Sequence, residues 1–114
     1  MRRIAVALDK DSLSFTDGCF VSIQYNYLES FINDDLKKLL DEDNFIDDFN
    51  DEFDTLLDWW EFEFLSSEKC GKLMSWSEKR SLNANCPALV KFYSTLKEYA
   101  SLAVENRTGV KFDF

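Results

Sequence analysis

The two ends of the chain both have patterns typical of β-strands, and this constrains the fold more than any other feature. Residues 3–8 contain an unbroken apolar run from Ile4 to Leu8, which indicates a short buried strand. Residues 110–114 alternate apolar and charged side chains, which predicts a half-buried strand. Because a strand needs a hydrogen-bonding neighbour, we expect the two ends to pair in one small sheet.

Helical periodicity dominates the segments between these strands. Apolar residues at helical spacing predict a helix over about 27–42. A second helical pattern follows Asn44, a good N-cap. Pro87 suits the first turn of a further helix, whose apolar face continues to about residue 104. Residues 66–86 are polar and mixed, and they indicate only one short helix after Ser75.

Two segments near the N-terminus complete the predicted elements. Residues 9–18 are rich in turn-forming side chains. Residues 19–26 alternate between apolar and polar positions, which predicts a strand. The expected fold is therefore α+β, a single domain over 1–114. In it, three or four helices pack on a small antiparallel sheet that includes the N- and C-terminal strands.

The sequence leaves the end of the second helix open. If the helix continues through residue 64, Phe64 extends its apolar stripe. Residues 59–64 also alternate, however, and their aromatic side chains favour a strand. A helix to residue 58 followed by a strand is therefore the alternative. The apolar stripe consists of Phe45, Phe49, Phe53, Leu56, Leu57 and Trp60.

Aromatic content and cysteine usage indicate a folded protein of the cytoplasm. The 114 residues include 11 Phe, 4 Tyr and 3 Trp, enough large apolar surface to offset the entropy lost on ordering the chain. The three cysteines, Cys19, Cys70 and Cys86, are odd in number and widely spaced, so a disulfide framework is not expected. The apolar run that ends at Leu8 is too short for a signal peptide or a membrane span.

Negative charge is concentrated in one region of the chain. Residues 29–63 contain 14 acidic and two basic side chains, a net charge of −12, whereas the rest contains 8 acids and 11 bases, a net +3. An acidic patch repels nucleic acid and anionic membrane, and it attracts basic proteins. We therefore expect a basic protein as partner, with no direct contact to nucleic acid or membrane.

Little in the sequence indicates catalysis, a metal or a cofactor. The chain has no histidine, the commonest general base and metal ligand, and no glycine-rich phosphate loop. Segments beginning at Asp9 and at Asp41 imitate calcium loops, but both lack the glycine at the sixth position. The expectation is a protein that is not an enzyme and binds neither metal nor cofactor.

A stripe of carboxylates is the most informative feature of the second helix. At 100° per residue these side chains lie opposite the apolar stripe, three or four residues apart. Like charges at this spacing destabilise a helix by about 0.2–0.5 kcal/mol per pair, so the arrangement works against local stability. We interpret the stripe as a partner-binding face, formed by Asp47, Asp51, Asp54, Asp58 and Glu61.

Two aromatic residues border this carboxylate stripe on the helical alternative. Trp59 lies at its edge and Phe62 within its polar arc. A large aromatic side chain surrounded by charges suits an interface anchor, so both residues are candidate partner-binding residues. On the strand alternative, Phe62 instead joins Trp60 and Phe64 on the core side.

In size, acidity, cysteine usage and lack of catalytic motifs, the whole chain resembles bacterial immunity proteins. These are the cognate inhibitors of colicin-type and contact-dependent growth-inhibition toxins. The resemblance is one of overall character, with no shared motif, so it assigns no site residues. It implies a cytoplasmic antitoxin that neutralises a toxin domain with a basic, nucleic-acid-binding cleft.

Other functions are compatible with the same acidic surface. A nucleic-acid mimic would use it to block a DNA-binding defence or restriction protein. A non-inhibitory adaptor subunit would use it to dock a basic partner. An enzyme of a kind that the sequence does not reveal would show activity that a single carboxylate substitution abolishes.

Overall fold

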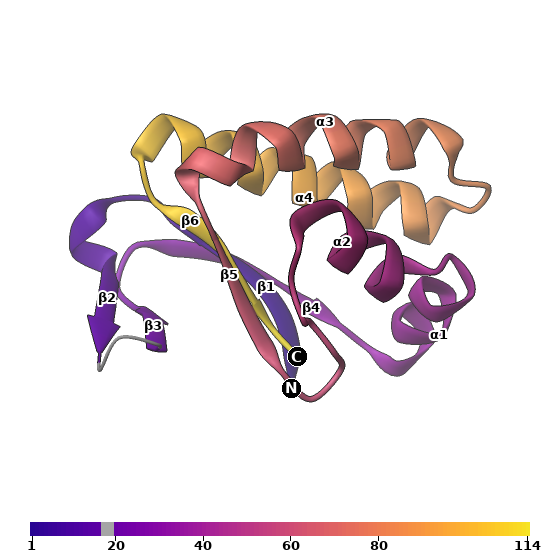
Figure 1. The fold of residues 1–114 in the computed structure, drawn as a ribbon, viewed down its shortest axis with the longest axis horizontal. Coiled ribbons are helices and arrows are strands. Elements are labelled where there is room, and N and C mark those ends of the chain that lie inside the picture. Colours follow the sequence, from indigo (N-terminus) through magenta and orange to yellow (C-terminus); the bar gives the residue numbers. More distant parts are fainter. Residues whose placement is uncertain (17–19) are drawn as a thin grey trace.

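The two ends of the chain pair with each other at the centre of a four-stranded antiparallel sheet. The computed structural model describes residues 1–16 and 20–114. Strand β1 (Arg2–Ala7) pairs with β6 (Gly109–Asp113), with Ile4 opposite Phe112 and Val6 opposite Val110. Strands β4 (Tyr27–Ile32) and β5 (Phe62–Ser66) complete the order β4-β1-β6-β5. The predicted α+β fold with paired terminal strands is confirmed (Figure 1).

Four helices pack with this sheet in a second layer. They are α1 (Asp34–Glu42), α2 (Phe45–Phe53), α3 (Ser67–Asn83) and α4 (Pro87–Asn106). The long helices α3 and α4 run side by side above the sheet, and α1 and α2 lie beside its end (Figure 1). Pro87 occupies the first turn of α4, as predicted, and Arg107 caps the other end of that helix with φ of 56°.

Aromatic rings from α2, α3 and α4 fill the centre of the core. Phe45 meets Phe92 edge to face at 5.4 Å, and Phe49 lies 4.8 Å from Phe112 of the sheet. Trp76 contacts the rings of both Phe45 and Phe49. Each such pair adds about 0.5–1.5 kcal/mol beyond the burial of its surface, so this cluster anchors α2 to the long helices.

A short helix and a strand occupy the segment predicted to be turn-like, and a second strand lies within the strand predicted for residues 19–26. The 3-10 helix η1 (Lys10–Ser12) leads into β2 (Leu13–Thr16), which pairs with β3 (Phe20–Ile23). Residues 17–19, which include the end of the predicted turn and the start of the predicted strand, lie outside the described residues. The hairpin covers Ala5 and Ala7 on the sheet face opposite the helices.

The prediction of one helix over 27–42 is wrong in its first part. Residues 27–32 form β4, and the helix begins only at Asp34. Asn33 separates the two elements, because its side-chain oxygen accepts the N–H of Leu36 at 2.8 Å and caps α1. Leu28, Phe31 and Ile32 happen to continue the helical spacing of α1, which explains the error.

The expectation of a short helix within 66–86 is also wrong. Helix α3 spans 17 residues, and its buried face includes Cys70, Leu73 and Ser77. Two of these three side chains are small, so the face lacks the large apolar residues that mark an amphipathic helix. Packing against α4, rather than an amphipathic pattern of its own, stabilises α3.

Candidate partner-binding surface

Helix α2 ends at Phe53, so the five predicted carboxylates do not share one helical face. Asp54 takes a left-handed conformation with φ of 55°, and its N–H donates to the carbonyl of Asn50. Neither alternative for the end of this helix, residue 58 or residue 64, is correct, although the strand predicted near 59–64 exists as β5. The carboxylates divide as follows: Asp47 and Asp51 on α2, Asp54 at its cap, Asp58 and Glu61 beyond it.

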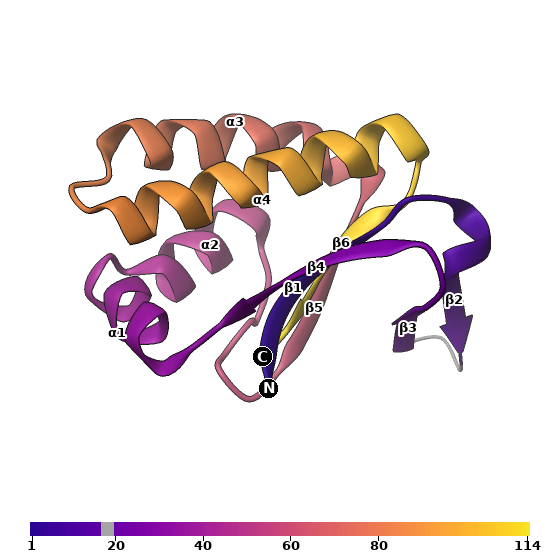
Figure 2. The ribbon, with the colours of Figure 1, turned by 180° about the vertical axis from the view of Figure 1, so that it is seen from behind.

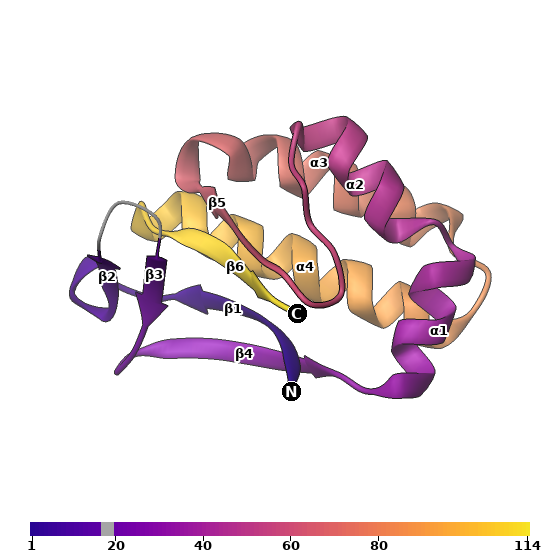
Figure 3. The same ribbon diagram turned by 60° about the horizontal axis from the view of Figure 1, so that its bottom comes forward.

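Residues 54–61 form a connection, here called the acidic loop, that runs from α2 past the C-terminus to β5 (Figure 3). The side chain of Asn50 holds this loop. Its Nδ2 donates to the carbonyl of Leu57 at 2.9 Å, and its Oδ1 accepts the N–H of Leu57 at 2.8 Å and the hydroxyl of Thr55 at 2.6 Å. One residue of α2 therefore sets the shape of the loop.

Side chains of the acidic loop alternate between the core and the surface. Leu57 and Trp59 point inward and are buried. Leu56 and Trp60 point outward, with 89% and 79% of their surface exposed. The sequence pattern had placed both Leu56 and Trp60 on the apolar stripe. That prediction is wrong, because α2 ends early and the loop that follows it is extended.

Trp59 is not an exposed anchor, contrary to the sequence-based prediction. Only 5% of its surface is exposed. Its ring stacks on Phe114 with 4.8 Å between centroids, and its Nε1 donates to Asp41 at 2.6 Å. The ammonium of Lys37 lies 5.1 Å from the ring centroid. Trp59 thus fastens the acidic loop to α1 and to the C-terminus.

Phe62, the second predicted aromatic, lies at the start of β5 and is 38% exposed. It pairs in register with Asp113 on the sheet face opposite the helices, and the ammonium of Lys111 lies 5.9 Å from its ring. Phe62 therefore does not join the core as the strand alternative expected. It borders the acidic loop through its neighbour Glu61.

The predicted carboxylates differ from most of the other acidic side chains of 29–63 in their ion pairing. Six acids of this region form ion pairs: Glu29, Asp34, Asp41, Asp43, Asp48 and Glu52. Among the residues that the structure describes, Asp47, Asp51, Asp54, Asp58 and Glu61 form none, and all five are exposed. Their charge therefore faces solvent without a cation from the same chain.

Three of the five predicted carboxylates line two separate hollows. Asp47 and Asp58 line a hollow of about 230 Å³ together with Asp41, and Trp59 forms part of its wall. Asp51 lines a separate hollow of about 320 Å³ together with Asp48 and Glu52. The structure thus brings Asp47 and Asp58 together, although they are far apart along the predicted helix face.

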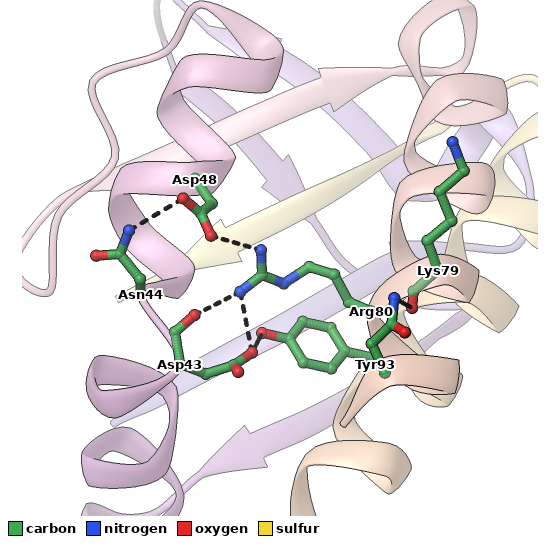
Figure 4. Close-up of polar contacts among 7 residues, drawn as sticks. Asp43, Asn44, Asp48, Lys79, Arg80 and Tyr93 are labelled. Carbon is green, nitrogen blue, oxygen red and sulfur yellow. Dashed lines mark hydrogen bonds and ion pairs between the residues drawn. The ribbon is translucent and has the colours of Figure 1, made fainter. Parts of the chain in front are cut away.

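A partly buried ionic cluster positions the start of α2 (Figure 4). Arg80 of α3 donates to Asp48 at 2.7 Å and to the side chain of Asp43 at 2.9 Å. The same Asp43 carboxylate accepts the hydroxyl of Tyr93 from α4. Burial would lower the pKa of Arg80, but its bonds to Asp48, Tyr93 and Asp43 outweigh burial and raise it. The cluster is consistent with a structural role.

The described residues contain no group of three or more His, Cys, Asp or Glu side chains placed to hold a metal ion. Burial raises the pKa of the Cys70 thiol to about 11, which suppresses the reactive thiolate. Cys19, one member of the cysteine set considered above, lies outside the described residues. Among the described helices, none combines the length and the apolar character needed to cross a membrane.

Comparison with protein families, with curated proteins and with solved structures finds no match to this chain.

Proposed function

We propose that this protein acts by binding and neutralising a basic protein partner, in the manner of an immunity protein that inhibits a nuclease-type toxin. The binding surface is the acidic loop together with Asp47 and Asp51 of α2. In this proposal the protein is a cytoplasmic inhibitor and does not act by catalysis.

The observation that carries the proposal is the exposure of Leu56 and Trp60 within a loop held in place from beneath. Asn50, Leu57 and Trp59 fix the loop to the core. A rigid loop loses little conformational entropy on binding, which favours affinity. Exposed tryptophan is also the residue type that most often dominates the energy of a protein interface.

Charge supports the same surface. The three carboxylates of the acidic loop, Asp54, Asp58 and Glu61, lie close in sequence to Leu56 and Trp60 and form no ion pair within the described part of the chain. Carboxylates around an apolar centre steer a basic partner into place and speed its association. They also disfavour partners that carry negative charge at the matching positions.

The nucleic-acid mimic is the second candidate from the sequence. A mimic that replaces phosphates needs repeated charge along its surface. Leu56 and Trp60 interrupt the carboxylates of the loop with large apolar side chains. This favours a partner with an apolar pocket bordered by basic residues over one that recognises charge alone.

Affinity capture from a lysate of the source organism, followed by titration with salt, tests the proposal. A basic protein should be retained at low salt and should associate more slowly as salt rises, because salt screens exposed charges beyond about 10 Å at 0.1 M. Replacing Asp51, Asp54 and Asp58 by Asn should slow its association and leave the fold unchanged.

The matched control removes the same number of charges elsewhere. Glu68, Glu98 and Glu105 are exposed on α3 and α4, and replacing all three by Gln changes the net charge equally. Binding that weakens equally in both triple variants would mean that only net charge matters. An unchanged affinity in the Asp-to-Asn variant would refute the assigned surface.

A further inference from the structure

Strand β4 is an open edge of the main sheet. It pairs with β1 from Arg2–Ile32 to Ala7–Tyr27, and no second strand pairs with it among the described residues. Figure 2 shows β4 along the near edge of the sheet, beneath α4. Half of the backbone N–H and C=O groups of such a strand point away from its single neighbour. These groups are available to another strand.

This edge lacks the features that usually prevent pairing with another chain. Natural edge strands are short, bulged, or contain lysine or proline. The six residues of β4 (Tyr-Leu-Glu-Ser-Phe-Ile) contain neither, and their register with β1 is continuous. The single charged side chain, Glu29, is held by Arg3 at 2.6 Å. Phe31 is 50% exposed on the same strand.

A small side chain opens a groove beside this edge. Ser30 pairs with Ile4, whose side chain lies in the core beneath the helices, so Ser30 faces the helices too. A groove of about 280 Å³ adjoins it, with more apolar than polar surface. Its lining includes Ser30, Phe31, Asp35, Leu36, Lys91 and Phe92. A large side chain at position 30 would fill the space that serine leaves.

We propose that β4 accepts an extended segment of a partner protein as an additional strand of the sheet. The partner residue opposite Ser30 is large and apolar and enters the groove toward Leu36 and Phe92. The groove is lined by one carboxylate, Asp35, and one ammonium, Lys91, and Asp35 forms no ion pair among the described residues. We expect the partner segment to be basic because residues 29–63, which include most of β4, carry a net charge of −12. The edge supplies main-chain hydrogen bonds, and the groove supplies side-chain selectivity.

A second copy of this chain is a poorer occupant than a basic segment. Each copy has a net charge of −9, so the approach of two copies is opposed electrostatically. Antiparallel pairing centred on Ser30 would place serine opposite serine and leave the groove unfilled. Pairing centred on Glu29 would place like charges opposite each other, which is destabilising.

This surface is separate from the acidic loop. The loop leads into β5, and β4 and β5 form opposite edges of the sheet. The proposal for β4 therefore does not depend on the proposed function of the loop, and either can fail alone.

Amide hydrogen exchange of the full-length protein with synthetic peptides tests the proposal. The probes are peptides of alternating lysine and valine with a central leucine or phenylalanine. A matched set carries N-methyl groups on alternate residues, which removes strand-pairing donors and keeps the charge. Unmethylated peptides should slow exchange of amides within residues 27–32, and methylated ones should not. Equal effects of the two sets, effects confined to residues 54–61, or no effect would overturn the proposal.

Substitutions in the chain provide a second test. Ser30→Leu fills the groove from within and should weaken peptide binding about tenfold, the value of burying one such side chain. Phe31→Lys should weaken it as well, whereas Leu82→Lys, which makes the same change in charge at an exposed site on α3 outside the groove lining, should not. Equal loss in the two lysine variants would overturn the proposal. So would concentration-dependent dimers of the chain alone that Phe31→Lys abolishes, because the occupant would then be a second copy.

Discussion

Trp59 and Trp60 are adjacent and chemically identical, yet they have opposite environments. Trp59 is buried against Phe114 and donates to Asp41, whereas Trp60 projects into solvent. Burial of a tryptophan removes a large apolar area from water, and exposure of its neighbour leaves the same area available to a partner. Adjacent positions of the acidic loop therefore differ in role: residue 59 belongs to the core, and residue 60 is available to a partner.

Truncating each tryptophan separately should distinguish these roles. We expect Trp59→Ala to lower the free energy of unfolding by about 3–5 kcal/mol, as large-to-small changes in a core do. Trp60→Ala should change it by less than about 0.5 kcal/mol. Urea denaturation followed by circular dichroism measures both values. Equal losses in the two variants would contradict the orientation of the loop.

Tyr93 makes the stability of the folded protein depend on pH in the alkaline range. Burial, together with its hydrogen bond to Asp43, raises the pKa of the Tyr93 phenol. The folded state then holds this proton more tightly than the unfolded state. The resulting stability is complete below the ordinary tyrosine pKa of about 10 and is lost as pH rises above it.

The urea midpoint of the wild type should therefore fall more steeply between about pH 9 and about pH 11 than that of Tyr93→Phe. Burial also raises the pKa of Cys70 and Tyr99, but both groups are present in both proteins, so the comparison isolates Tyr93. Parallel loss of stability in the two proteins would show that the phenol does not titrate with unfolding.

Among the elements, the acidic loop depends most on one side chain of α2. Replacing Asn50 by Ala removes three hydrogen bonds that hold Thr55 and Leu57. We expect a loss of about 1–3 kcal/mol in stability, and faster amide exchange and proteolysis within residues 54–61. Asn85→Ala, at an exposed site between α3 and α4, is the control and should leave the loop protected. Unchanged exchange at Leu57 in Asn50→Ala would be the contrary result.

The pairing of β5 with β6 requires a glycine. A Cβ at Gly109 would lie 2.2 Å from Cζ of Phe64 and 2.5 Å from the backbone oxygen of Leu65. Gly109→Ala should therefore destabilise the protein by about 1–3 kcal/mol, a typical cost of overpacking. Phe64→Ala in the same chain should recover only part of this, since the backbone contact remains. Full recovery, measured by thermal unfolding, would mean that the ring alone conflicts with the added carbon.

The sequence predicted elements well where hydrophobic pattern and capping agree. The terminal strands and α4 are of this kind, with clear periodicity and Pro87 at the first turn. It failed for β4, because the exposed Leu28 and Phe31 of an edge strand mimic helical spacing. It also failed for α3, whose buried face uses Cys70 and Ser77. In both cases contacts with neighbouring elements determine the structure. The periodicity of the local sequence carries no information about those contacts.

The candidate site could be predicted only in part for a related reason. The five carboxylates are exposed, as a charged stripe suggests, but the stripe is not a helix face because Asp54 ends α2. Which tryptophan faces solvent depends on Asn50. Its hydrogen bonds to Leu57 fix which side chains of the loop point inward and which point outward. Nothing in the local pattern of 54–61 identifies that contact.

On the scale of the whole molecule, the proposed function depends on how charge and exposed apolar surface coincide. The region 29–63 carries −12 and the rest +3, so negative charge is concentrated on the elements between β4 and β5 and attracts cations to them. The exposed Leu56 and Trp60 lie within this region of the chain. Charge is expected to set the rate of association, and the two apolar side chains the lifetime of the complex.

The most direct test is the dissociation constant of the basic partner, once captured, for the wild type, Trp60→Ala and Leu82→Ala. Leu82 is an equally exposed apolar residue on α3, remote from the loop in sequence. Trp60→Ala should weaken binding by about 2 kcal/mol, roughly 30-fold, as expected for an interface hot spot, and Leu82→Ala should bind as the wild type does. Wild-type affinity in Trp60→Ala would contradict the central claim that the acidic loop is the partner-binding surface.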